Sequence, residues 1–369
     1  MKKVGIVGID LTNLPNVKGK DALDASGNNF GNMLFTNAAY QQIYNALHIG
    51  FKWDPAKVRE QCSSIFIPAA NWINIKQDWG WLADLIEETD LPCTVVGLGA
   101  QIDTLEDVKA IPLGTKKLLS VIAERSTGIG VRGDFTAQVV RDCGLSNIEV
   151  LGCPSIFTFG HVPKLRNVVA NEVSRIGVGP TRYVLNKIND TNRLDKQRLL
   201  YQFAIREASS IYYQSEQDEI QELARENLRD NEQDALAQSY YGISNQSKLS
   251  NALLEKGKYH TSLSSWLADV RKDDVYVGTR IHGAIASTLA GTPPLLITHD
   301  NRTRELAETM AVPCVDINNF CISSLFDLPE LINSLDYDKY TRRSELNFKK
   351  LYKFYLNNNL KTSLDISCV

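Results

Sequence analysis

Two basic side chains stand at a junction between an apolar run and a helical pattern late in the chain. The run Val275–Gly278 is typical of a buried strand, and Ile281–Ala290 predicts a helix of small and aliphatic residues. Arg280 and His282 lie where this helix begins. A helix N-terminus carries partial positive charge, so cations there cost up to about 1 kcal/mol. The two residues therefore predict a bound anion that compensates for them, or a neutral His282; the alternative is a surface arginine and a histidine satisfied within the core.

A second junction follows the same logic in the first half of the chain. Gly128–Val131 is a strand candidate, Phe135–Cys143 predicts a helix, and Arg132 lies at the turn with Asp134 as the expected N-cap. A guanidinium group binds carboxylate or phosphate through two parallel hydrogen bonds. Arg132 and Arg280 are therefore expected to hold the two ends of one small molecule that carries two anionic groups. The alternative is that Arg132 pairs with a structural carboxylate.

Three further loops that follow strand candidates supply weaker candidates for substrate binding. They are a Gly/Asn loop near residue 30, a glycine turn near residue 99 and the turn after residue 298. Glycine and asparagine suit tight turns as well as ligand loops, and an aspartate at a helix start suits an N-cap. The candidate residues of these loops are Asn29, Gly31, Asn32, Gly99, Gln101, His299 and Asp300.

Positioning these residues requires parallel strands joined by helices, and the sequence predicts such an α/β fold. Short apolar runs alternate with longer helical patterns, which is typical of parallel sheets with crossover helices. The pattern forms two sets, so we predict two α/β domains over residues 1–172 and 173–330, and a helical extension over 331–369. Helices are expected, among other places, at Tyr40–Leu47 and Tyr337–Leu356. The predicted strands are Lys3–Ile9, Ser64–Pro68, Thr94–Gly97, Gly128–Val131, Glu149–Leu151, Arg175–Gly179, Ser210–Gln214, Val275–Gly278 and Pro294–Thr298.

Composition excludes several classes of protein. Forty lysine and arginine residues against 43 acidic residues give a net charge of −3, without the basic excess that nucleic-acid binding needs. The seven cysteines have no zinc-binding spacing, so no metal site is expected. Neither a signal peptide nor an apolar run of transmembrane length is found, which predicts a cytoplasmic protein.

The segment Tyr337–Leu356 alternates aromatic and basic residues and suggests a peripheral contact with a membrane. A basic amphipathic helix can rest on an anionic membrane surface. The alternative is a helix packed across both domains, with its basic residues in water.

Several of these segments, taken together, resemble the polysaccharide pyruvyl transferases. The resemblance covers roughly residues 5–310. Members of that family are similar to GT-B glycosyltransferases, so it implies two Rossmann-like domains facing a cleft and a C-terminal helix that packs back on the first domain. The segments are Asn29–Asn32, Gly97–Gln101, Val131–Thr136, Val150–Ser155, Thr279–Gly283 and His299–Asp300.

The resemblance implies a reaction as well as a fold. The donor would be phosphoenolpyruvate, and the acceptor a sugar hydroxyl pair of a polysaccharide or its lipid-linked precursor, joined as a pyruvate ketal. No further cofactor is implied. Arg280 and Arg132 would hold the donor, and His282 is the candidate general acid because a proton must reach the donor methylene carbon. The family commonly has aspartate at the position of Asn32, so a base role there is in doubt; Asp24 and Asp300 remain open as the base.

Two other functions stay open on the sequence alone. A GT-B glycosyltransferase with a nucleotide-sugar donor would share the fold and a histidine at a helix start. A protein that only binds a glycan or an anion would not need His282.

Overall fold

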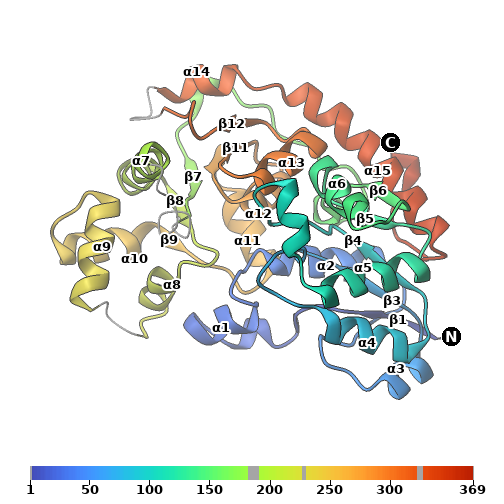
Figure 1. Ribbon diagram of the computed structural model, residues 1–369. Helices are drawn as coiled ribbons and strands as arrows, with labels where there is room; N and C mark the ends of the chain where they lie inside the picture. Colours follow the sequence, from blue (N-terminus) through green and yellow to red (C-terminus); the bar gives the residue numbers. More distant parts are fainter. Residues whose placement is uncertain (1, 182–190, 227–229, 322–326, 369) are drawn as a thin grey trace.

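Short apolar runs in both halves of the chain form parallel strands. The computed structural model describes residues 2–181, 191–226, 230–321 and 327–368 (Figure 1). The first sheet has the order β2-β1-β3-β4, and a strand pair, β5-β6, continues beyond it through a bridge between Leu98 and Val131. Its strands are β1 (Lys3–Ile6), β2 (Ala46–His48), β3 (Cys62–Pro68), β4 (Cys93–Val96), β5 (Ile129–Val131) and β6 (Ile148–Val150).

The second sheet has the order β12-β11-β10-β7-β8-β9, and all its pairs are parallel. The predicted α/β class is thereby confirmed, and the two parallel sheets agree with a GT-B-like architecture. The domain boundaries stay a prediction. The strands are β7 (Ile176–Gly179), β8 (Ser210–Tyr212), β9 (Gly257–Lys258), β10 (Val275–Gly278), β11 (Pro294–Thr298) and β12 (Cys314–Asp316).

Helices connect and cover these strands (Figure 1). Those that bear on the site are α2 (Asn32–Gln42), α6 (Asp134–Asp142), α8 (Gln217–Leu223), α12 (Ile281–Leu289) and α13 (Asn301–Met310). The others are α1 (Gly19–Ala25), α3 (Pro55–Gln61), α4 (Gly80–Thr89), α5 (Leu113–Arg125), α7 (Thr191–Glu207), α9 (Asn231–Tyr241), α10 (Gln246–Lys256), α11 (Leu263–Val270), α14 (Leu328–Asn333) and α15 (Tyr337–Asn357).

One predicted helix is wrong, and the reason is local. The sequence predicts a helix over Tyr40–Leu47, but α2 ends at Gln42 and residues 46–48 form β2. Asn45 has a left-handed backbone with a φ of 57°, which a continuing helix does not allow. Ala46 then pairs with Val4 of β1, so sheet pairing decides the conformation of the segment.

Helix α15 packs across both halves of the chain (Figure 1). In its middle Asn347 donates a hydrogen bond to the Thr309 carbonyl (2.8 Å), and near its end the Tyr355 hydroxyl donates to Gln42 Oε1 (2.7 Å). Its aromatic face is buried, as the packed alternative predicted. The opposite side, here called the basic face, consists of Arg342, Leu346, Lys349, Lys350, Lys353 and Leu356, all exposed.

The cations of the basic face form no ion pairs in the described part of the chain. Within the described part of the chain, none of its four cations lies within 4.0 Å of a carboxylate oxygen. None of the described helices is long and apolar enough to cross a lipid bilayer.

Candidate active site

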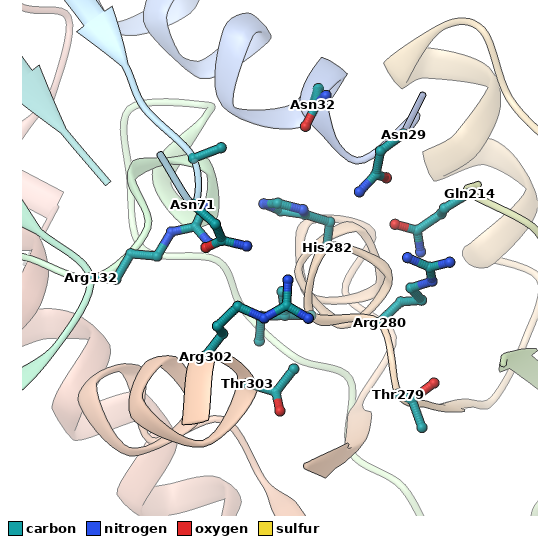
Figure 2. Close-up of a pocket in the computed structure, with 12 residues that line it drawn as sticks. Asn29, Asn32, Asn71, Arg132, Gln214, Thr279, Arg280, His282, Arg302 and Thr303 are labelled. Carbon is teal, nitrogen blue, oxygen red and sulfur yellow. The ribbon is translucent and has the colours of Figure 1, made fainter. Parts of the chain in front are cut away.

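A pocket lies where carboxyl ends of second-sheet strands meet loops of the first half. Such strand ends are where α/β proteins bind ligands. Figure 2 shows His282 in the middle of the group, with side chains from both halves around it. The lining residues are Asn29, Asn32, Ala70, Asn71, Arg132, Gln214, Thr279, Arg280, Ile281, His282, Arg302 and Thr303.

Arg132 enters the pocket from the turn between β5 and α6. It is 2% exposed, its Nε donates to the Gly97 carbonyl (2.8 Å), and its Nη1 donates to Asn71 Oδ1 (2.5 Å). Its Nη2 has no hydrogen-bond partner among the described residues, and no carboxylate lies within 4.0 Å there. Burial lowers the pKa of Arg132. The guanidinium is therefore oriented by neutral groups and makes no close ion pair among the described residues, while the charge of Glu305 acts on it from beyond 4.0 Å.

Arg280 is arranged differently, because its charge is already compensated. Its guanidinium contacts the carboxylate of Glu216 and the hydroxyl of Ser215, in the turn after β8. The second oxygen of Glu216 accepts the backbone N–H groups of Gln214 (3.0 Å) and Ser215 (3.1 Å). Burial raises the pKa of Glu216, but Arg280 and these N–H groups outweigh it and hold the pKa below its usual value. Arg280 and Glu216 therefore form a buried neutral pair beside the pocket.

His282 lies in the first turn of α12 and is 7% exposed. Its Nε2 is buried without a hydrogen-bond partner in the described part of the chain. Burial, together with the charges of Arg132 and Arg280, lowers the pKa of His282 to about 3. The ring is therefore neutral at pH 7 in the unliganded protein. Of the two explanations that the sequence left open for a histidine at this helix end, the lowered pKa favours a neutral ring, and a bound anion stays a prediction.

Two of the predicted glycines let the backbone approach these side chains. A Cβ on Gly31 would lie 2.7 Å from His282 Nδ1, and a Cβ on Gly99 would lie 2.9 Å from Arg132 Cδ. Both distances are shorter than atoms tolerate. Gly31 and Gly99 thus shape the site through close packing.

The two predicted asparagines line the pocket and also hold the loop before α2. Asn29 Oδ1 accepts the Gly31 N–H (2.8 Å), and Asn32 Nδ2 donates to the Ser26 carbonyl (2.9 Å). An aspartate at position 32 could not donate this hydrogen bond. Asn32 therefore acts as a donor to the loop.

The remaining sequence candidates lie outside the pocket lining. Gln101 is exposed, and His299 is buried with 1% of its surface exposed. Asp300 accepts the Thr303 N–H (2.8 Å) as the N-cap of α13 and pairs with Arg302 (2.5 Å). Asp24 pairs with Lys20 at the surface. Neither candidate base faces the pocket.

Several pocket residues were not predicted. Asn71 follows β3, Gln214 follows β8, and Arg302 and Thr303 open α13 after β11. Gln214 Nε2 is buried and has no partner among the described residues. All four follow the carboxyl end of a parallel strand, so that position is the signal that would have found them.

A family model described as polysaccharide pyruvyl transferase matches residues 20–301. A search of curated protein sequences found no match. The matched region extends from α1 to the start of α13 and so includes almost all of the pocket lining. The chain belongs to the polysaccharide pyruvyl transferase family, which indicates pyruvyl transferase activity.

Proposed function

We propose that the protein transfers pyruvate from phosphoenolpyruvate to two hydroxyl groups of a sugar, in a polysaccharide or its lipid-linked precursor, and forms a pyruvate ketal. One observation carries the proposal of this donor. Arg132 is a buried cation without a carboxylate partner in the described chain, and it faces the same pocket as the unpartnered Nε2 of His282 and Nε2 of Gln214. Buried charges are stable only when paired. A small anion supplies the missing partner.

The donor carries a carboxylate and a phosphate, and the pocket offers different partners to each. Arg132 supplies the net positive charge. Arg280 contributes no net charge, because it forms a neutral pair with Glu216. The first turn of α12 adds backbone N–H groups that have no partner within the helix and no bond from the N-cap side chain, and such groups favour an anion. We place the phosphate near Arg132 and His282, because its double negative charge stabilises the positive charge of these two groups most.

The chemistry begins with a proton transfer to the donor methylene carbon. The C2 centre becomes cation-like, a sugar hydroxyl adds to it, and the C2–O bond to phosphate breaks. A second hydroxyl then closes the ketal. One proton has been added to carbon and two have left the hydroxyls, so one returns to the acid and the other leaves with inorganic phosphate. The reaction is balanced without an oxidant or reductant.

His282 is the proposed general acid. The ring is neutral in the unliganded protein, but a bound anion favours its charged form. Donor binding therefore converts His282 into an acid at the place where the proton is needed. After the transfer the neutral ring accepts a proton from an acceptor hydroxyl, so no separate carboxylate base is required.

An anionic surface is a proposed second contact, through the basic face of α15. Its four cations have no ion-pair partners in the described chain, and two exposed leucines, Leu346 and Leu356, accompany them. Cations beside apolar side chains suit the headgroup region of an anionic bilayer. Such a contact would hold the protein where a lipid-linked glycan acceptor resides.

The test is acceptor-dependent phosphate release. Phosphoenolpyruvate is offered with galactose-, mannose- and N-acetylhexosamine-containing acceptors, and the wild type is compared with His282→Gln and Arg280→Ala. Release that needs an acceptor and is lost in both variants supports pyruvyl transfer at this site. Consumption of a nucleotide sugar, with no release from phosphoenolpyruvate, would instead establish a glycosyltransferase. Anion binding without turnover of either donor would leave a binding protein.

A further inference from the structure

Helix α6, which follows Arg132, lacks a local cap. Its N-cap is Gly133, and the expected capping residue, Asp134, lies one position inside the helix. Helix N-termini need acceptors for their exposed N–H groups, and these usually come from the N-cap side chain. Glycine offers none.

The acceptor comes from the other half of the chain. Glu305 of α13 accepts the Thr136 N–H through Oε2 (2.9 Å) and the Thr136 hydroxyl through Oε1 (2.7 Å). The Thr136 hydroxyl in turn accepts the Ala100 N–H (2.9 Å), in the turn that follows β4. Glu305 is 6% exposed and Thr136 is fully buried. This network therefore joins α13, α6 and the glycine turn near residue 99.

The local sequence is adapted to this arrangement. A Cβ on Gly133 would lie 3.0 Å from Glu305 Oε2 and 2.9 Å from Thr309 Oγ1. A side chain at the N-cap would therefore push α13 away. Glycine here keeps α13 close enough for its carboxylate to cap α6.

Thr136 and Glu305, the two ends of this hydrogen-bond network, both lie next to the pocket. Arg132 is four residues before Thr136, and the pocket residues Arg302 and Thr303 are within one turn of Glu305. Burial raises the pKa of Glu305, while the Thr136 hydrogen bonds and the charge of Arg132 lower it. The carboxylate therefore interacts with the arginine as well as with the helix it caps.

We propose that Glu305 is a positioning residue: by capping α6 from the second half of the chain, it fixes Arg132 against the pocket residues of that half and so sets the affinity for the anionic substrate. The inference rests on the proposed function for the identity of that substrate. It predicts that loss of Glu305 acts through Arg132. A merely structural carboxylate would act through stability instead.

A double-mutant cycle separates the two roles. Dissociation constants for phosphoenolpyruvate are measured by calorimetry for the wild type, Glu305→Ala, Arg132→Gln and the double variant. We expect Glu305→Ala to weaken binding about tenfold in the wild-type background and less than twofold in the Arg132→Gln background, because coupled residues are not additive. Glu308→Ala, an exposed glutamate of the same helix, is the matched control and should change nothing.

Further variants and a second ligand keep the test decisive. Glu305→Gln retains an acceptor for the Thr136 N–H and should recover most of the affinity. Should Glu305→Ala not fold, Glu305→Leu replaces it, since leucine fills a similar volume and offers no acceptor to the Thr136 N–H. Equal losses in both Arg132 backgrounds would overturn the positioning role. Inorganic phosphate is titrated in parallel: wild type that binds phosphate but not phosphoenolpyruvate would refute the proposed donor and still allow the cycle to be measured.

Discussion

Binding of the donor should protonate His282, and the size of the expected rise in its pKa follows from the charges in the site. In the unliganded protein the pKa of His282 is about 3, so the ring is neutral at pH 7. A doubly charged phosphate at about 4 Å, in an effective dielectric of about 20, favours the charged ring by about 8 kcal/mol. Each pKa unit corresponds to about 1.4 kcal/mol. The pKa of His282 should therefore rise above 7, and about one proton should be taken up for each donor bound.

Calorimetry in buffers of different ionisation enthalpy measures this uptake. The heat of phosphoenolpyruvate binding at pH 7 is recorded in several buffers, and its slope against buffer enthalpy gives the number of protons bound. His282→Gln provides the correction for protons taken up by the donor itself. We expect the wild type to take up about one proton more than the variant. Equal uptake in the two proteins would refute the reasoning, because His282 would then stay neutral with donor bound and would not be the acid.

Further expectations follow from the same electrostatics. Arg132→Met should weaken donor binding about a hundredfold and lower the free energy of unfolding in urea by no more than about 1–3 kcal/mol, because the guanidinium loses hydrogen bonds to neutral groups only and no ion pair in the described chain. Glu216→Gln should cost about 3 kcal/mol or more in the same assay, since it leaves Arg280 in a buried site without its counter-ion. The folded pKa of His282 lies below the unfolded value, so its contribution to stability is present above about pH 6.5 and is lost as the pH falls toward 4; the loss, about 3 kcal/mol, should be absent in His282→Gln. Replacing the four cations of the basic face of α15 by glutamine should abolish co-sedimentation with phosphatidylglycerol vesicles in low salt and leave phosphate release on a soluble acceptor unchanged; vesicle binding equal to that of the wild type would contradict the surface contact.

The strands near the pocket were predictable because their apolar runs are buried on both faces. Val275–Gly278 and Pro294–Thr298 match β10 and β11 residue for residue. The short strand β9, only Gly257 and Lys258, carries no such run and forms because β8 lies beside it. Pairing supplied by the sheet, rather than a local pattern, decides such segments.

The site was predictable where a residue type conflicts with its local position. Arg280 and His282 conflict with the positive end of a helix, and both line the pocket. What the pattern does not contain is the partner of each group. Glu216 is 64 positions away from the arginine it neutralises, and Glu305 is 169 positions away from the helix it caps. Such long-range pairs decide that Arg132 and not Arg280 brings net charge to the pocket. The Arg280–Glu216 pair forms when the second half folds, and the Glu305 hydrogen bonds form when the two halves pack.

The central claim is ketal formation from phosphoenolpyruvate, and the product tests it most directly. The reaction is run in heavy water with phosphoenolpyruvate and the acceptor that gives phosphate release, and the glycan is analysed by mass spectrometry and proton NMR. The account predicts a glycan that carries one pyruvate ketal with one deuterium in its methyl group, and no such product from His282→Gln. A glycan that gains a sugar residue, or a ketal whose methyl group carries no deuterium, would contradict it.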